Sequence, residues 1–173
     1  MHRYLLAIAS LSALLVIPAG RANAQVFLAK FSGFNEIGGL GAAETGAILS
    51  GGQGWLIVNL DEGARKLTYT LTYSGLSSVT QAHIHFGKNH VAGGVIVFLC
   101  TNLGNGPAGT PACPASGGTV KGTITPASVV GPKGQNVTPG DFDALAVALI
   151  SDTAYGNIHT KKFPIGEIRG QLR

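Results

Sequence analysis

The sequence predicts an all-β fold, an antiparallel β-sandwich or barrel of about eight or nine short strands with one short helix. Three observations support this prediction. Of the 173 residues, 45% are apolar and 12% are charged, which is typical of a folded domain rather than of a disordered chain. The 26 glycines and 8 prolines, without a collagen-like repeat, indicate many turns between short elements. Several segments also alternate apolar and polar residues with the period of two that strands require.

The first 24 residues have the features of a secretory signal peptide. Arg3 provides a basic start, an apolar run follows over 5–17, and Ala22 and Ala24 frame a cleavage site. This run is shorter than the roughly 20 residues that span a bilayer, so we expect signal removal rather than a membrane anchor. The expected mature protein, 25–173, is then a single domain that is secreted or periplasmic and has no membrane partner.

The charge pattern gives little support to a nucleic-acid partner. Twelve basic residues oppose eight acidic ones, but Arg3 and Arg21 fall in the expected signal peptide, which leaves ten against eight. No basic run after them is longer than Lys161-Lys162, and the chain has no aromatic ladder. Binding to phosphates requires clustered Lys and Arg, so we expect no nucleic-acid partner.

The clearest predicted strand covers 67–73, where Leu and Tyr alternate with three threonines. Segment 53–60, which is more uniformly apolar over 55–58, precedes it, and the intervening Asp61-Glu62-Gly63 predicts a hairpin. Further strands are expected at 26–34, 45–49, 79–86, 94–100, 118–125, 155–160 and 166–172.

One segment has helical rather than strand periodicity. Thr138 provides an N-cap, Pro139 suits the first helical position, and the apolar residues of 142–149 recur at helical spacing. We therefore expect a single helix that begins near Thr138 and crosses one end of the strands.

Cys100 and Cys113 are the two cysteines of the chain. In an exported protein an even number of cysteines favours a disulfide over free thiols. The segment between them, TNLGNGPAGTPA, consists of turn-forming residues with little apolar surface, so a cross-link would add about 3 kcal/mol of stability. The alternative, a thiolate metal ligand or a redox pair, lacks the close spacing that those roles usually show.

Three histidines fall on the polar side of two predicted strands. In AHIHFG, His83 and His85 have one parity and the apolar residues around them have the other. We expect the apolar set to face the core and both imidazoles to point away from it. In AYGNIHT, His159 lies on the polar side in the same way. If the two strands are neighbours, the three imidazoles meet on the outer surface.

These histidines predict a surface metal site. Neutral imidazole is a good ligand for copper and zinc, and we expect His83, His85 and His159 to hold one such ion, with His90 in loop 87–93 as a candidate fourth ligand. The only methionine is the initiator and the cysteines are expected to be paired, which disfavours thiolate and methionine-rich copper centres. The alternative, histidines that hydrogen-bond to backbone or carboxylates and bind nothing, stays open.

The motifs taken together resemble the CHRD (chordin) domain. The matching segments are, in order, FSGFNEI, TYTLTYSGL, AHIHFG, AYGNIHT and GEIRGQL, and they span nearly all of the mature chain. The resemblance implies an extracellular all-β domain of a kind found in chordin-type animal proteins and in exported bacterial proteins. Beside the histidines, it draws attention to Asn157, Glu167 and Arg169. Glu167 is a candidate to orient a histidine or to pair with Arg169. For Arg169 itself we expect a structural role.

We therefore expect an exported binding domain that holds copper or zinc and has no enzymatic activity. The alternative is a metal-free extracellular protein-interaction or adhesion module, whose binding would persist in chelator. A fainter similarity to copper/zinc superoxide dismutase rests on the His-x-His strand and the disulfide, but the further zinc-loop histidines and aspartate are missing, so a redox enzyme ranks third. No Gly-x-Ser-x-Gly, His-Glu-x-x-His or nucleotide-binding motif appears, and no catalytic residue is expected.

Overall fold

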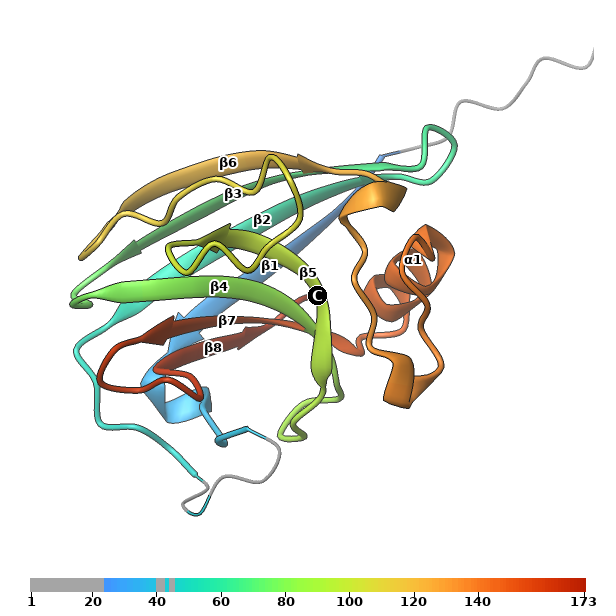
Figure 1. Cartoon of the computed structure of the whole chain (residues 1–173). Coiled ribbons are helices and arrows are strands. Elements are labelled where there is room, and N and C mark those ends of the chain that lie inside the picture. The colour runs from blue at the N-terminus through green and yellow to red at the C-terminus, as the bar shows by residue number, and fades with distance from the viewer. Residues whose placement is uncertain (1–23, 40–42, 44–45) are drawn as a thin grey trace, which may run out of the picture.

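Eight antiparallel strands form a sheet that curls into a nearly closed barrel, and helix α1 (Phe142–Ile150) lies at one end of it (Figure 1). This computed structural model describes residues 24–39, 43 and 46–173. The predicted all-β class is confirmed. Of the two predicted forms, sandwich and barrel, the sheet has the barrel-like one. The expected signal peptide lies outside the described residues, apart from Ala24.

The order of the strands brings distant motifs together. Across the sheet the order is β5-β4-β7-β8-β1-β2-β3-β6, and neighbouring strands are antiparallel. Strands β4, β7 and β8 therefore lie side by side, and they carry the segments AHIHFG, AYGNIHT and GEIRGQL. The bounds are β1 (Gln25–Ser32), β2 (Gln53–Asp61), β3 (Lys66–Ser74), β4 (Val79–Phe86), β5 (Gly94–Thr101), β6 (Gly118–Ile124), β7 (Ala154–Thr160) and β8 (Ile168–Gln171).

The predicted hairpin is confirmed, whereas one predicted strand is wrong. Strands β2 and β3 pair from Gln53 opposite Ser74 to Asp61 opposite Lys66. The strand expected at 45–49 does not form, since the described residues 46–49 are irregular. Both edges of β1 are already occupied, by β2 and by β8, so this short apolar segment has no free edge beside β1 to join.

Helix α1 begins later than the sequence predicts. The side chain of Asp141, not that of Thr138, caps it by accepting the N–H of Ala144 at 3.0 Å. Gly140 has a φ of 90°, which no right-handed helix can contain, so the chain makes a turn at Thr138 and starts the helix after it. Within the described part of the chain, no helix has the length and apolar character needed to cross a membrane.

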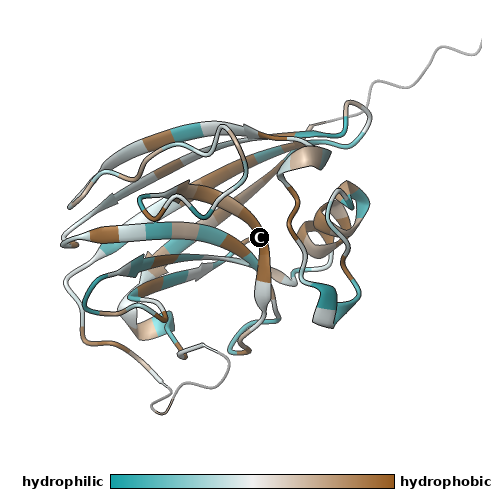
Figure 2. Ribbon diagram, in the orientation of Figure 1, coloured by the Kyte–Doolittle hydropathy of each residue, from teal (hydrophilic) through white to brown (hydrophobic). Residues whose placement is uncertain are grey.

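The interior of the barrel holds the apolar core, and apolar and polar residues alternate along the strands that enclose it (Figure 2). Phe31, Leu56 and Ile84 are among its fully buried side chains. Gly156 on β7 faces the same interior, because a Cβ there would overlap the ring of Phe31. Ile84 is paired with Gly156, so the residues that alternate with them on β4 and β7 face the other side of the sheet.

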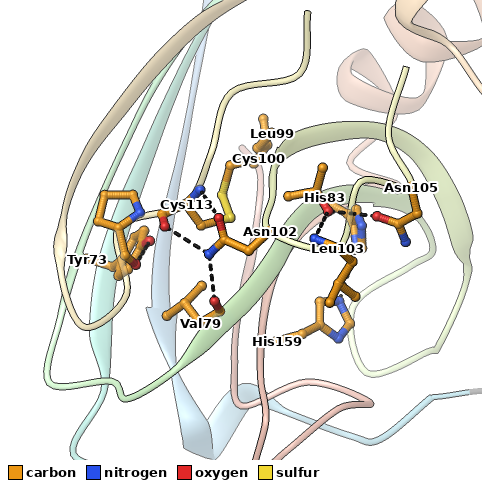
Figure 3. Close-up of a disulfide and its surroundings, with 12 residues drawn as sticks. Tyr73, Val79, His83, Leu99, Cys100, Asn102, Leu103, Asn105, Cys113 and His159 are labelled. Carbon is orange, nitrogen blue, oxygen red and sulfur yellow. Dashed lines mark hydrogen bonds between the residues drawn. A yellow bond between two sulfur atoms is a disulfide. The ribbon is translucent and has the colours of Figure 1, made fainter. Parts of the chain in front are cut away.

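The disulfide predicted between Cys100 and Cys113 is confirmed. It ties the end of β5 to the chain that leads into β6, and both cysteines are buried. The amide of Asn102 supports the same loop, because Nδ2 donates to the carbonyls of Val79 and Cys113 and Oδ1 accepts the N–H of Cys113 (Figure 3).

Candidate metal centre

His83, His85 and His159 meet on the side of the sheet that faces away from the apolar core. His83 and His85 come from β4 and His159 comes from β7, and these two strands are paired. One ligand nitrogen from each ring lies within 4.8 Å of the others. Strand parity therefore places all three rings on one face, and the pairing of β4 with β7 brings them together.

The rings are buried, so the expectation of a surface site is wrong. His83, His85 and His159 keep 3%, 8% and 5% of their exposure. Three stretches of chain cover this face of the sheet: segment 33–39 after β1, loop 87–93 after β4 and loop 161–167 between β7 and β8. The polar face becomes a second interior, filled by histidine, asparagine and arginine side chains.

Backbone carbonyls orient two of the three rings. Nδ1 of His85 lies 3.0 Å from the carbonyl oxygen of Gly93, and Nδ1 of His159 lies 3.0 Å from that of Pro164. A carbonyl can only accept, so each Nδ1 carries the proton and each Nε2 presents a lone pair. Histidines that bind metals are commonly held in this way through their second nitrogen.

His83 connects the cluster. Its Nδ1 lies 3.1 Å from Nε2 of His159, and because that Nε2 is an acceptor, His83 is the donor. The remaining Nε2 atoms of His83 and His85 are buried and have no hydrogen-bond partner among the described residues. Buried polar atoms are seldom left without a partner, and a metal ion is one partner that suits two lone pairs.

Burial lowers the pKa of all three imidazoles, because the protonated form loses its hydration. The pKa falls to about 2 for His83, where the charges of His159 and His85 act in the same direction. It falls to about 3 for His85, although the hydrogen bond to Gly93 opposes the shift, and to about 4 for His159. All three rings are therefore neutral at physiological pH, which is the form that binds metal ions.

Aromatic and guanidinium groups hold the cluster in place. The ring of Phe98 packs edge-on against His83 at 4.4 Å between centroids. Tyr155 stacks on His85 at 4.8 Å with an angle of 7° between the planes, and the guanidinium of Arg169 lies 3.3 Å from the Tyr155 centroid. These contacts restrict the rotation of His83 and His85 and exclude solvent from them.

The three polar residues expected beside the histidines are engaged elsewhere. The side chain of Asn157 donates to Glu36 and to the carbonyl of Ile168. Glu167 accepts from the hydroxyls of Ser50 at 2.7 Å and Thr160 at 2.6 Å, so the structure gives it no part in orienting an imidazole or pairing with Arg169. Arg169 is buried, and its Nη2 donates to the backbone carbonyls of Lys88 and Val91.

His90 does not join the other histidines. It is exposed, has a φ of 59° in the loop after β4, and is absent from the group of three residues able to share an ion. The groups that do contact the rings, the carbonyls of Gly93 and Pro164, gave no signal in the sequence, because every residue carries a carbonyl.

The comparison with known families agrees with this arrangement. A family model described as the CHRD domain matches residues 39–172, which include β2 to β8 and all three clustered histidines. This chain belongs to the CHRD domain family. Neither the curated proteins nor the solved structures contain a significant match to it. Membership of the CHRD family indicates an extracellular binding or interaction module.

Proposed function

We propose that this CHRD domain is an exported protein, secreted or periplasmic, that holds one copper or zinc ion through His83, His85 and His159. One observation carries the proposal: one ring nitrogen from each of His83, His85 and His159 lies within 4.8 Å of the others. Carbonyls at Nδ1 of His85 and His159 hold the proton there and leave Nε2 of each ring unprotonated. Imidazole nitrogens bound to one zinc ion at about 2.0–2.1 Å lie roughly 3.3 Å apart, so the three nitrogens have to move closer together when an ion binds.

The donor set suits these ions better than the alternatives. Three imidazoles without a carboxylate or thiolate fit copper or zinc, whereas magnesium and calcium require oxygen ligands. Because the rings are neutral, the ion needs to displace no proton from His85 or His159. It replaces the hydrogen bond between His83 and His159. His83 then either moves its proton from Nδ1 to Nε2 or turns its ring so that the Nε2 lone pair faces the ion. The three protein ligands leave room for a fourth, exchangeable ligand.

Isothermal titration of the purified protein with zinc(II) and, separately, with copper(II) tests the proposal. We expect saturable binding of one ion per chain, and loss of that binding in the double variant His83→Ala/His85→Ala. His90→Ala is the matched control and keeps the affinity of the parent, because His90 lies outside the cluster.

Because removing two buried rings can unfold the protein, circular dichroism is measured on each variant, and His159→Gln, which keeps the approximate volume, provides a second test. Electron paramagnetic resonance of the copper(II) form should show hyperfine coupling to three nitrogens. Absence of saturable uptake by the parent protein, or uptake unchanged in the folded variants, contradicts the proposal.

A second candidate function is a metal-free protein-interaction module, and the outer face of β1 and β2 favours it. Leu28 and Trp55 are 53% and 54% exposed, and Leu28 is paired with Ile57, which is 40% exposed. A contiguous exposed apolar patch of this kind is a common mark of an interaction surface. Binding of an extracellular partner that persists in chelator and is lost in Trp55→Ser supports this function. Binding of the partner that is lost when the metal is removed contradicts this function.

A further inference from the structure

We infer that a separate cavity, the cationic cavity, binds a small oxyanion through Arg169, Lys30 and Arg173. The cavity has a volume of about 270 Å³ and lies at the junction of β1, β8 and the loop after β4. Amide side chains of Asn35, Asn89 and Gln171 also line it, as does His90. None of the lining residues is Asp or Glu. None of the three clustered histidines lines the cavity, although Arg169 lies against Tyr155, which stacks on His85.

Arg169 is the strongest argument for an anion. Its side chain is 2% exposed, and its Nη2 donates to the carbonyls of Lys88 at 3.1 Å and Val91 at 2.9 Å. Its Nη1 is buried without a hydrogen-bond partner among the described residues. Arg169 forms no ion pair with a carboxylate of the described residues, among which Arg65 is paired with Asp143.

A buried guanidinium without a counter-ion is costly, because arginine keeps its charge and a charge removed from water requires compensation. Burial lowers the pKa of Arg169, and Tyr155 and then Glu36 oppose this shift in part. The carboxylate of Glu36, however, accepts its hydrogen bonds from Asn157 and from the N–H of Ile37. An anion in the cationic cavity would complete the compensation.

The chemistry of the wall selects an oxyanion. The side chains of Lys30 and Arg173 are exposed and positively charged. Asn89 also lines the wall, and Asn35 Nδ2 donates to the carbonyl of Arg169 at 3.2 Å. The main-chain oxygen of Arg173 accepts the N–H of Leu28, which ties this residue to β1. A guanidinium group can bind two oxygens of a phosphate or of a carboxylate at once. Both anions therefore have the chemistry that the cavity would recognise.

Titration of protein freed of metal by dialysis, at constant ionic strength maintained with sodium chloride, tests this inference. Inorganic phosphate is the probe in one arm and malonate in the other, and calorimetry or the amide resonances of 87–93 report binding. We expect saturable binding of one anion per chain, and the tighter of the two arms identifies a phosphate or a carboxylate as the natural group.

The test variant is Lys30→Gln/Arg173→Gln, whose residues are exposed and whose replacement should leave the fold intact. The matched control is Lys121→Gln/Lys133→Gln, which removes the same charge away from the cavity. We expect the test variant to weaken binding by about tenfold or more and the control to change it by less than about twofold. Failure of both anions to saturate, or equal weakening in the two variants, overturns the inference.

Discussion

Nδ1 of His83 lies 3.1 Å from Nε2 of His159, and this hydrogen bond joins the histidines of β4 to the histidine of β7. The lone pair of His159 that accepts it is the one that the proposed ion would use. The hydrogen bond and coordination by this lone pair therefore exclude each other. In the metal-free protein, the bond keeps the two rings in the positions from which they would bind.

Acid should destabilise the metal-free protein at a pH well above the range where carboxylates titrate. The pKa values of about 2, 3 and 4 for His83, His85 and His159 lie below the value of about 6.5 in the unfolded chain. The unfolded state therefore binds more protons, and the contribution of these rings is complete above about pH 6.5 and decreases as the pH falls toward the folded-state values.

Urea unfolding at pH 7.5, 6.0 and 5.0 measures this loss. We expect the midpoint concentration to decrease steadily, and His159→Gln to reduce the slope. A midpoint that is constant between pH 7.5 and 5.0 would show that the three rings are accessible to protons in the folded state.

Replacing Gly156 by alanine should damage the apolar core beneath the histidines. The new Cβ would overlap Cζ of Phe31 and lie 2.9 Å from its Cε1 and 3.3 Å from Cδ2 of Leu56. Overpacking of this kind costs on the order of 1–3 kcal/mol of unfolding free energy. Gly134→Ala is the control, since no atom lies within 4 Å of the added Cβ. Equal midpoints for the two variants in urea would contradict the packing described here.

Loss of the disulfide should lower stability without changing the fold. Cys100→Ala/Cys113→Ala removes a link across 13 positions of sequence, and we expect a loss of about 3 kcal/mol in the free energy of unfolding. The hydrogen bonds of Asn102 remain to hold the loop. A reducing agent should bring the parent protein to the stability of the variant and leave the variant unaffected. A variant as stable as the oxidised parent would contradict the prediction.

The two aspartates at the start of α1 should contribute unequally. Asp141 accepts the N–H of Ala144, so Asp141→Ala should cost about 1 kcal/mol. Asp143 forms an ion pair with Arg65 at 2.7 Å, but the two side chains are 74% and 47% exposed. Solvent screens such a pair, and Asp143→Asn should cost about half as much or less. Thermal unfolding at fixed pH measures both, and a reversed order would contradict the assignment of the cap.

The strands and the facing of the histidines were predictable because side-chain alternation is written directly in the sequence. His83 and His85 alternate with Ala82 and Ile84, and that alone decides which side of β4 each one occupies. The start of α1 was mistaken because the positive φ of Gly140, which separates Thr138 from the helix, has no periodic signal.

The burial of the histidines could not be predicted, because it depends on loops rather than on strands. Loops 87–93 and 161–167 have no apolar repeat that shows where they lie, yet they fold over the rings and supply the carbonyls of Gly93 and Pro164. Tyr155 has the same strand parity as His159, and parity alone does not show what its ring contacts. Its contacts with both His85 and Arg169 depend on the pairing of β4, β7 and β8.

The paired strands β4 and β7 separate the apolar core on one face of the sheet from the polar histidine cluster on the other. Ile84 and Gly156 face the apolar core, whereas the residues next to them in sequence, His83 and Asn157, face the histidine cluster. Substitutions among the polar side chains and their covering loops can therefore alter what the protein recognises while the packing on the opposite side is preserved.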